Sequence, residues 1–311
     1  MLKMSSFSFL VTGCTGFIGS HLVERLSSLG HSVHCIIRPD SNLIRISNVS
    51  KNLNLHTCVN EYDLERLFDN FKFDYIFHLA TEYHKYDDFS RFSSMIDSNI
   101  KFPSLLISLA AKNDVKGFIN TGSFFEYSPS PSAIDENSLL APNNFYSRTK
   151  ICFESILKTF IDSLPIATLK IFYPYGPRDN FKLIPLLFDS ILNNRAISLS
   201  QGNQRIDPIF IDDIIDSYIC CIDWLSTPTN KYSYHSFNIG SGKPFSIREI
   251  VEQVELISSS NLNVEWGDPS KVDVGDYYAD ISKATSILGW TPKFSLHEGL
   301  SRYFSEYKEL S

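Results

Sequence analysis

Tyr146 and Lys150 are the residues of this sequence whose types and spacing best suit proton transfer. They stand four positions apart in the run Tyr146-Ser147-Arg148-Thr149-Lys150, and residues four apart share one face of a helix. We expect the Lys150 ammonium to lie beside the Tyr146 phenol and to lower its pKa from the usual value of about 10. Such a phenol exchanges a proton with the oxygen of an alcohol or a ketone. Because a Tyr and a Lys at this spacing also occur by chance on exposed helices, the surrounding elements must decide what the pair does.

The elements around the pair alternate between strands and helices. Short apolar runs predict strands at 7–11, 33–37, 75–79, 117–120 and 166–172, and amphipathic stretches predict helices at 17–29, 61–70, 89–113 and 144–163. This alternation predicts an α/β fold with a doubly wound parallel sheet, and Ser123 falls at the end of its fourth strand. Prolines interrupt the pattern after Tyr173. Beyond that point we predict helices at 183–192, 212–224 and 247–257 and a late strand at 236–240.

The composition narrows the classes of partner and compartment. The chain has 311 residues, 43% of them hydrophobic, and a formal net charge of -7, which argues against a nucleic-acid partner. No apolar stretch approaches the roughly 18 residues of a membrane span, and the first apolar run is too short for a signal peptide. The six cysteines show no metal-ligand spacing, so we expect free thiols, no metal site and a reducing, cytoplasmic location.

A glycine-rich run follows the first predicted strand and precedes the first predicted helix. Its sequence is Thr12-Gly13-Cys14-Thr15-Gly16-Phe17-Ile18-Gly19. Glycines permit positive φ and a close approach of the backbone to a ligand, and the amides at a helix start attract a pyrophosphate. In this context the run predicts a dinucleotide site on a Rossmann-type sheet, with cofactor contacts from Gly13, Thr15, Gly16, Phe17, Ile18 and Gly19.

The end of the second predicted strand distinguishes NAD from NADP. NAD sites usually place an acidic residue there to bind the ribose hydroxyls. In this chain Ile37 occupies the position, and Arg38 follows it. The Arg38 guanidinium offers a partner for a 2′-phosphate that no carboxylate repels, so we predict NADP(H) in preference to NAD(H). The alternative is that Arg38 is a solvated loop residue before Pro39.

Taken together, the glycine run, Ser123, Tyr146 and Lys150 resemble the extended short-chain dehydrogenase/reductase family, which includes nucleotide-sugar epimerases, dehydratases and ketoreductases. The resemblance covers nearly the whole chain. Further matching motifs are His78-Leu79-Ala80, Asn99, Phe172-Tyr173-Pro174-Tyr175-Gly176-Pro177, Asp212-Asp213, Phe237-Asn238-Ile239-Gly240-Ser241-Gly242 and Leu288-Gly289-Trp290-Thr291-Pro292. With the element pattern, it predicts an NADP-binding Rossmann domain at 1–172 and about 205–240. A smaller, interleaved C-terminal substrate domain is predicted at about 173–204 and 241–311.

The family resemblance implies roles for individual residues. In such proteins Ser, Tyr and Lys act as one unit: Ser123 would hydrogen-bond the substrate oxygen and Tyr146 would donate or accept its proton. Lys150 would bind the nicotinamide ribose while lowering the tyrosine pKa. The resemblance also implies cofactor contacts from Leu79, Ala80, Thr81, Asn99 and Phe172, besides Tyr146 and Lys150. It implies substrate contacts from Glu82, Tyr83, Ser123, Phe124, Tyr146, Tyr173 and Arg205.

Two phenylalanines bear on which reaction the family resemblance implies. Dehydratases of the family carry an Asp-Glu pair immediately after the catalytic Ser or Thr, whereas this chain has Phe124 and Phe125. Neither ring transfers a proton, which argues against dehydration. The runs at 78–83 and 120–125 look most like the abequose synthase type of 4-ketoreductase. We therefore expect NADPH-dependent reduction, at C4, of a nucleotide-linked 4-keto-6-deoxy sugar, a building block of bacterial surface polysaccharide such as the lipopolysaccharide O-antigen.

Three departures from the family pattern fall in the expected substrate site. Tyr173 stands where the family has Asn. The usual Arg-Asp pair reads Arg205-Ile206-Asp207, which moves the arginine to the other face of a strand, and Asp273 replaces a second arginine. Either a nearby cation compensates, or the substrate is not an ordinary nucleotide diphosphate sugar. The candidate cations are Arg178, Lys182 and Arg205, unless the first two are solvated loop charges.

Two other functions remain open at this point. One is an NAD-dependent nucleotide-sugar epimerase, which would hold its cofactor tightly and need none added. The other is a noncatalytic dinucleotide-binding regulator, which the intact Ser123, Tyr146 and Lys150 disfavour. The helices at 89–113 and 144–163 correspond to those that pair subunits in many relatives, so the resemblance also implies a homodimer.

Overall fold

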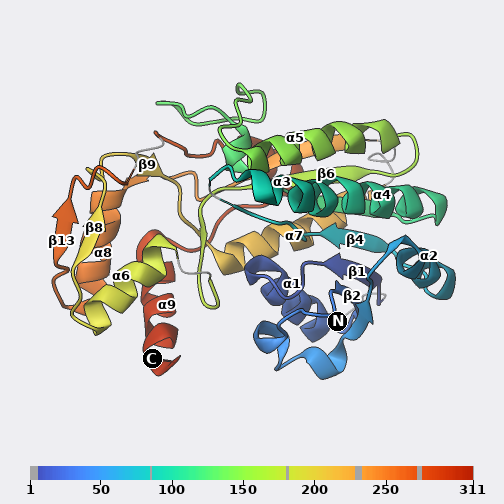
Figure 1. Cartoon of the computed structure of the whole chain (residues 1–311), viewed down its shortest axis with the longest axis horizontal. Coiled ribbons are helices and arrows are strands. Elements are labelled where there is room, and N and C mark those ends of the chain that lie inside the picture. Colours follow the sequence, from blue (N-terminus) through green and yellow to red (C-terminus); the bar gives the residue numbers. More distant parts are fainter. Residues whose placement is uncertain (1–5, 85, 180–181, 228–232, 272–274, 311) are drawn as a thin grey trace. The chain divides into compact units, whose positions relative to one another are not determined.

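The computed structural model describes residues 6–84, 86–179, 182–227, 233–271 and 275–310. Strands and helices alternate through the first part of the chain (Figure 1). The longer elements up to residue 171 are β1 (Ser8–Thr12), α1 (Phe17–Ser28), β2 (Ser32–Ile37), β3 (Asn54–Thr57), α2 (Glu61–Asn70), β4 (Tyr75–His78), α3 (Phe89–Ile96), α4 (Phe102–Lys112), β5 (Gly117–Ser123), α5 (Phe145–Leu157) and β6 (Ile166–Ile171). Short helical turns separate some of them: η1 (Ile44–Ile46), η2 (Ser50–Asn52), the π-helical η3 (Asp97–Lys101), η4 (Phe124–Glu126) and η5 (Lys158–Phe160).

The rest of the chain is built from shorter strands and four longer helices among the described residues. The strands are β7 (Pro174–Tyr175), β8 (Ile197–Leu199), β9 (Arg205–Ile206), β10 (Ile209–Phe210), β11 (Tyr234–Ile239), β12 (Phe245–Ser246) and β13 (Val264–Trp266). The longer helices are α6 (Leu183–Leu192), α7 (Ile211–Leu225), α8 (Ile247–Ser258) and α9 (Leu296–Leu310), and a short π-helical turn, η7 (Ala284–Leu288), precedes α9.

A seven-stranded sheet organises these elements in the order β11-β6-β5-β4-β1-β2-β3. The strand pairs β1–β2, β2–β3, β1–β4 and β4–β5 run parallel, with Val11 opposite both Cys35 and Phe77. From β1 the chain adds strands outward on one side and then returns to build the other side. This order confirms the predicted α/β fold with a Rossmann-type, doubly wound parallel sheet.

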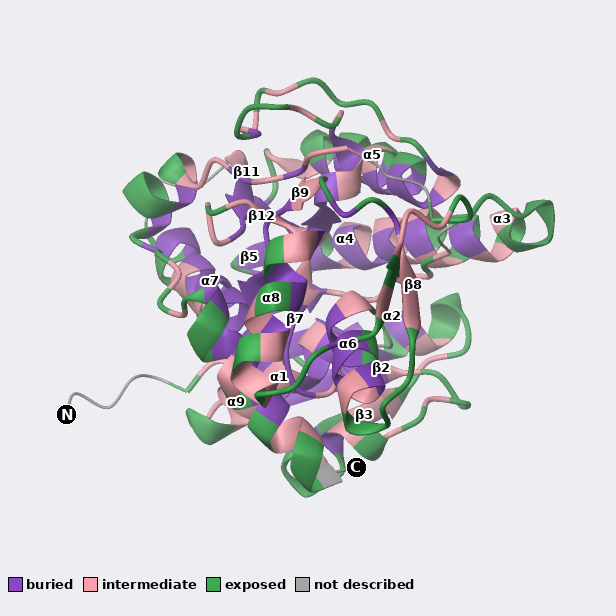
Figure 2. Ribbon diagram, turned by 90° about the vertical axis from the view of Figure 1, so that its left-hand side faces the viewer, coloured by how far each residue is buried: buried purple, intermediate pink, exposed green. Residues whose placement is uncertain are grey.

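Alternating side chains on the strands supply a core on each face of the sheet. Leu10, Ile76 and Phe118 pack in one cluster with buried residues of α2, α4 and α5. The next residues along, such as Phe77, point to the opposite face, where the ring of Phe77 meets Tyr218 of α7 at 5.9 Å. Figure 1 shows α4 and α5 on one side of the sheet and α1 and α7 on the other. Figure 2 shows buried residues along the strands and the inner sides of the helices.

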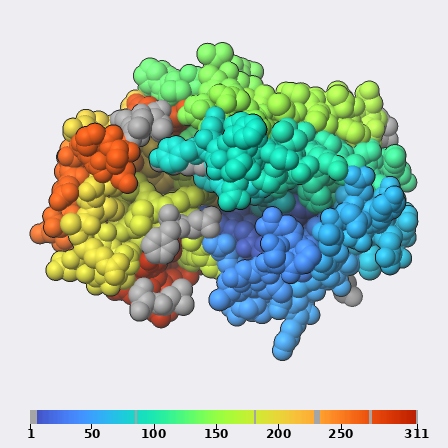
Figure 3. Space-filling model, in the orientation of Figure 1, coloured from blue at the N-terminus to red at the C-terminus, as the bar shows by residue number. Residues whose placement is uncertain are grey.

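The chain divides into two compact units. Unit 1 comprises residues 1–126, 140–170 and 215–237, and unit 2 comprises 127–139, 171–214 and 238–311. The chain therefore passes repeatedly from one unit to the other. In Figure 3 the surface of unit 1 is shared by its blue N-terminal residues and the teal α3 and α4. No helix among the described residues is long and apolar enough to cross a membrane.

Most predicted elements are confirmed, and the exceptions have physical reasons. The helix predicted at 89–113 is one helical stretch that the π-helical turn η3 divides into α3 and α4. The pattern did not predict β3, because Asn-Leu-His-Thr is short and mostly polar, as an edge strand tolerates. It also did not predict α9, because the apolar residues of this amphipathic helix are separated by polar and charged residues in the sequence.

The glycine run forms a tight turn between β1 and α1. Gly13 has φ +75, and a Cβ there would lie 2.6 Å from the backbone nitrogen of Ala80. A Cβ on Gly19 would collide with the carbonyl oxygen of Gly13. Gly13 therefore allows the loop to approach the residues after β4, and Gly19 allows the loop to approach its own backbone.

We predict that Gly19→Ala lowers the free energy of unfolding by about 1–3 kcal/mol, because the methyl group forces the backbone apart. Gly16→Ala is the matched control, since its backbone is extended and its Cβ would meet only the Gly13 oxygen, at 3.2 Å. Urea denaturation of both variants measures the difference. Equal stability of the two variants would contradict this account of the loop.

Candidate active site

Ser123, Tyr146 and Lys150 come from two neighbouring elements of unit 1. Ser123 is the last residue of β5. The Asn144 side chain caps α5 by accepting a hydrogen bond from the Ser147 N–H at 2.9 Å, and Ser147 Oγ accepts one from the Asn144 N–H at 3.4 Å. This pair of reciprocal hydrogen bonds, a capping box, begins α5. Tyr146 and Lys150 of the helix face inward, with 8% and 4% of their surface exposed. The structure thus brings the three residues of the predicted unit together.

The pKa of the Tyr146 phenol is raised, whereas the sequence spacing predicts that it is lowered. Burial is the largest cause and the Glu126 carboxylate adds to it, while hydrogen bonds with Ser123 and Thr81 oppose the rise. The expected lowering by Lys150 is wrong, because the loss of water around a buried phenol outweighs a nearby cation. Like an ordinary phenol it is protonated at neutral pH, but the raised pKa makes it a weaker acid, so a partner must stabilise the phenolate that proton donation leaves.

Lys150 lies at the end of β5, close to the phenol. Its Nζ donates to the carbonyl oxygen of Thr121 at 3.0 Å and lies 5.8 Å from the centroid of the Tyr146 ring. The Thr121 hydroxyl is 2.6 Å from the hydroxyl of Tyr218, which helps to fix this end of the strand. Burial lowers the pKa of Lys150 to about 8, although the Glu126 carboxylate opposes the change. The ammonium is therefore close to losing its proton in a mildly alkaline solution.

Aromatic rings stand beside the Tyr146 phenol. The ring of Tyr83 meets Tyr146 edge to face at 4.9 Å and stacks with Phe125 at 6.5 Å. Phe125 in turn contacts Phe124 at 4.1 Å. Phe124 is buried and Tyr83 is 45% exposed. The two phenylalanines thus extend an apolar wall at the positions where dehydratases carry their acid and base.

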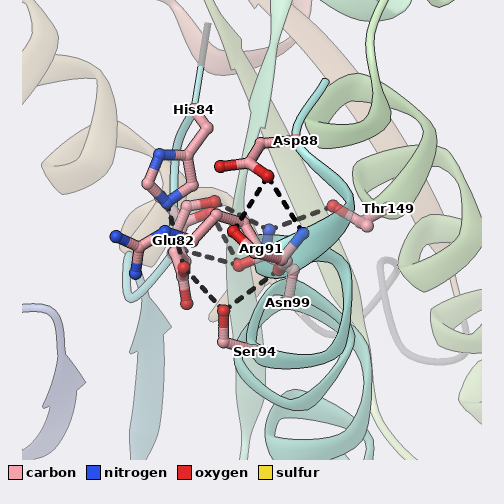
Figure 4. A network of polar contacts seen from close by, with 9 residues as sticks. Glu82, His84, Asp88, Arg91, Ser94, Asn99 and Thr149 are labelled. Carbon is pink, nitrogen blue, oxygen red and sulfur yellow. Dashed lines mark hydrogen bonds and ion pairs between the residues drawn. The ribbon is translucent and has the colours of Figure 1, made fainter. Parts of the chain in front are cut away.

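Asn99 ties the loop after β4 to α5, as Figure 4 shows. Its side-chain oxygen accepts hydrogen bonds from Thr81 Oγ1 at 3.1 Å and from the Glu82 N–H at 2.8 Å. Its side-chain nitrogen donates to the Glu82 carbonyl at 2.9 Å and to Thr149 Oγ1 at 3.0 Å. Asn99 is 2% exposed. It therefore positions the loop, and with it Thr81, beside Tyr146.

The carboxylate of Glu82 is also held within this network (Figure 4). Its Oε1 lies 3.0 Å from Nε2 of His84 and accepts a hydrogen bond from Ser94 Oγ at 2.8 Å. Leu79 and Ala80, the residues just before this loop, lie against Gly13, because a Cβ on that glycine would contact their backbone. The predicted residues of the β4 loop and the glycine run are therefore neighbours.

Residues around the glycine run suit a bound dinucleotide. Gly16 is the N-cap of α1, no side chain caps the helix, and its first turn holds no acidic residue. Phe17 is buried, whereas Thr15 and Ile18 are half-buried. The N–H groups that begin α1 thus have no competing carboxylate in the first turn of the helix, and a phosphate at this end would meet the positive end of the helix dipole.

Two arginines lie after β2. Arg38 is exposed, and its Nε is 3.7 Å from Oδ1 of Asp40. Sequence reasoning missed Arg45, whose Nη1 donates to the carbonyl oxygen of Thr15 in the glycine run at 3.4 Å. No spacing rule points to it, because η1 brings it back to the loop. Among the residues that the structure describes, no His, Cys, Asp or Glu side chains gather in a group that would hold a metal ion.

The predicted site residues of unit 2 differ in their burial and in their contacts. Arg205 is bound on both sides: its Nε and Nη2 each lie 2.8 Å from Oδ2 of Asp276, and Nη2 also donates to the Pro131 carbonyl. Phe172, a predicted cofactor contact, is buried, with its N–H donating to the Ile239 carbonyl. Tyr173, Arg178 and Lys182 are each partly or fully exposed. Asp273 lies outside the described residues.

A buried charged cluster beneath Ser123 was missed by sequence reasoning. Lys170 Nζ lies 2.8 Å from Oε2 of Glu126 and 3.1 Å from Oε2 of Glu154. Glu126 Oε1 accepts a hydrogen bond from the Ser123 N–H at 2.7 Å. The available signal was a charged residue inside an apolar segment: Lys170 interrupts a strand that is buried at every position. Such a residue needs a buried partner of opposite charge.

Comparisons with known proteins agree with this geometry. Over 304 residues the chain is 26% identical to a CDP-abequose synthase of Salmonella muenchen, covering 95% of this chain and 96% of the relative. It is 27% identical to a UDP-glucose 4-epimerase of Pisum sativum, covering 94% and 93%. Among solved structures, a UDP-glucuronic acid 4-epimerase from Bacillus cereus, in complex with UDP-glucuronic acid and NAD, matches with a TM-score of 0.85. That protein is 25% identical, with 98% of this chain and 100% of the other covered.

A family model also matches most of the chain. It covers residues 9–240, from β1 through the glycine run, Ser123, Tyr146 and Lys150 to β11. The sheet order and the grouping of these residues in unit 1 are consistent with that match. The chain therefore belongs to the NAD dependent epimerase/dehydratase family.

Proposed function

We propose that this protein uses NADPH to reduce the keto group, at C4, of a nucleotide-linked 4-keto-6-deoxy sugar. The observation that carries the proposal is the buried Tyr146 phenol beside Ser123 and Lys150, with only phenylalanine rings at the neighbouring positions 124 and 125. One proton donor suffices to reduce a ketone, whereas elimination of water needs a further acid and base. The similarity to CDP-abequose synthase supports this choice within the family.

Each residue of the unit has a physical role in the proposed reaction. A bound nicotinamide supplies the hydride. The Ser123 hydroxyl and the Tyr146 phenol hydrogen-bond the ketone oxygen, and Tyr146 passes its proton to that oxygen as negative charge develops on it. The Lys150 ammonium then stabilises the phenolate left on Tyr146. Tyr83 and Phe125 exclude water from one side of the phenol.

The cofactor preference rests on the end of β2. Arg38 and Arg45 supply positive charge on this side of the glycine run. Ile37 occupies the position where NAD sites usually carry an acidic residue, so no carboxylate there would repel a 2′-phosphate. We propose NADP(H) over NAD(H) on this ground. The exposed carboxylate of Asp40 lies next to Arg38 and would have to release the guanidinium to a bound 2′-phosphate.

An NAD-dependent nucleotide-sugar epimerase is the second candidate function. It is favoured by the similarity to the UDP-glucose 4-epimerase and by the solved epimerase that holds NAD. An epimerase would be purified with bound NAD and would interconvert two sugars with no added cofactor.

For either activity we propose that the protein is a cytoplasmic homodimer. We also propose that the substrate is contacted by Glu82, Tyr83, Tyr173 and Arg205.

A panel of CDP-, dTDP-, GDP- and UDP-linked 4-keto-6-deoxy sugars tests the proposed function. We expect ketone-dependent oxidation of NADPH with one nucleotide preferred, measured as loss of nicotinamide absorbance. Interconversion of nucleotide sugars without added cofactor, and no NADPH oxidation with any ketone, would favour the epimerase.

We predict that Tyr146→Phe lowers kcat by about 10²–10⁴-fold, because the proton donor is lost while the ring and its packing remain. Initial rates of NADPH oxidation give kcat, and a fluorescence titration with NADPH shows whether the cofactor site is intact. Tyr62→Phe, at a side chain on α2 that is 76% exposed, is the matched control. Wild-type rates from Tyr146→Phe would rule out the mechanism.

The low pKa of Lys150 predicts an alkaline limit to activity. The ammonium is present below a pKa of about 8 and is lost as the pH rises through that value. We therefore expect kcat to fall with a midpoint near pH 8. In Lys150→Arg the charge persists at higher pH, so any remaining activity should not fall near this pH. A fall of kcat at the same pH in Lys150→Arg would mean that another group causes this alkaline limb of the pH profile.

We predict that Arg38→Ala raises the KM for NADPH by roughly tenfold, or about 1.4 kcal/mol, and leaves the KM for NADH nearly unchanged. The physical reason is that only NADPH carries the 2′-phosphate. Arg66→Ala, at an exposed arginine of α2, is the control. Equal changes for both cofactors would show that Arg38 does not select between them.

A further inference from the structure

We propose that Glu126 is a positioning residue for the reaction: its buried carboxylate holds the backbone of Ser123 in place and supplies the negative charge that the Lys150 ammonium faces. The inference rests on the proposed function, because it concerns the same three catalytic residues. Glu126 itself touches neither substrate nor cofactor in this account. It acts through Ser123, Tyr146 and Lys150.

The contact with Ser123 is direct. Glu126 Oε1 accepts a hydrogen bond of 2.7 Å from the N–H of Ser123, the last residue of β5. A hydrogen bond to a carboxylate is shorter and stronger than one between neutral groups. The carboxylate therefore fixes the residue whose hydroxyl bonds to Tyr146.

The other carboxylate oxygen of Glu126 forms an ion pair with Lys170. Oε2 of Glu126 lies 2.8 Å from Nζ of Lys170, with 1% and 3% of the two side chains exposed. Both side chains pack over Gly122, where a Cβ would lie 3.0 Å from Glu126 Oε1, from Lys170 and from Thr168. A carboxylate held at both oxygens cannot turn outward, so Glu126 does not replace the acid that dehydratases place near this point.

The groups that face Glu126 come from three elements besides its own. On α5 these are Tyr146, Lys150 and Glu154; on β6 it is Lys170; and on β11 it is Tyr234. Two carboxylates share the Lys170 ammonium, and Glu154 also pairs with Lys158, whose Nζ lies 3.2 Å from its Oε1, so Glu126 is the carboxylate whose charge acts on the catalytic residues. Burial raises the pKa of Glu126, while the Lys170 ammonium and the Ser123 N–H favour its ionised form.

The charge favours the form of Lys150 that ketone reduction needs. The Glu126 carboxylate opposes the fall in the pKa of Lys150 caused by burial, and it also raises the pKa of Tyr146. At neutral pH the lysine thus keeps the charge that must stabilise the phenolate left when Tyr146, a weakened acid, donates its proton. Glu154 also binds Lys170, but it is not among the groups that shift the pKa of either catalytic residue.

The comparison of Glu126→Gln with Glu154→Gln tests the proposal. Each variant removes one carboxylate charge from Lys170, and glutamine keeps the shape of the side chain. We expect Glu126→Gln to lower kcat by about 10- to 100-fold and to move the alkaline limb of kcat to lower pH by about one unit. Glu154→Gln should leave the limb where the wild type has it. Thermal denaturation and NADPH titration of both variants report folding and cofactor binding separately from catalysis.

A second variant covers the case in which Glu126→Gln does not fold. Glu126→Asp keeps the charge but withdraws it from the Ser123 N–H, so kcat should fall without a shift of the alkaline limb. Wild-type kcat and pH profile in Glu126→Gln, or the same shift in Glu154→Gln, would overturn the proposal. If the wild type itself turns over no ketone, the proposed function fails first; the ¹³C NMR titration of Lys150, assigned by its loss in Lys150→Arg, then still decides whether Glu126→Gln lowers its pKa.

Discussion

The burial of an ionisable pair at the end of β5 is the constraint on which the rest of unit 1 depends. Tyr146 and Lys150 are nearly without water, and removing water from a phenol and an ammonium favours their neutral forms. The phenol stays protonated but becomes a weaker acid, so it needs a cation nearby to stabilise its phenolate. The charge of that cation, the Lys150 ammonium, is retained through the Thr121 carbonyl and the Glu126 carboxylate. The protein thus keeps a donor and a cation side by side in a place that would otherwise neutralise the cation.

Sheet topology explains why these groups meet. The strands β1, β4 and β5 are neighbours in the order β5-β4-β1 and run parallel, so their carboxyl ends share one edge. The glycine run follows β1, the Leu79–Ala80 step follows β4, and Ser123 ends β5. Ligands of open α/β sheets bind outside this edge. Asn99 and the cap of α5 then complete the arrangement by fixing the β4 loop and the first turn of the helix.

Local patterns were enough to predict most of the sheet, the longer helices of unit 1 and the residues Ser123, Tyr146 and Lys150 that the fold brings together. The glycine run and the spacing of Tyr146 and Lys150 are short-range features, and their chemistry follows from residue type. What the sequence did not predict depends on distant partners. The raised pKa of Tyr146 comes from burial, which spacing does not report, and the Glu126–Lys170–Glu154 cluster joins three segments. Arg45 reaches the glycine run only because η1 folds back toward it, and the Arg205–Asp276 pair is likewise a contact between distant residues.

In the proposed reaction, hydride passes from a nicotinamide to a sugar ketone and the product is released. The most direct measurement uses NADPH carrying deuterium on the transferable position of nicotinamide C4, with the preferred nucleotide-linked 4-keto-6-deoxy sugar, and analysis of the product by NMR and mass spectrometry. The account predicts one deuterium on the former ketone carbon for each NADPH oxidised. Product without deuterium, or epimerised sugar formed while NADPH is not consumed, would contradict it.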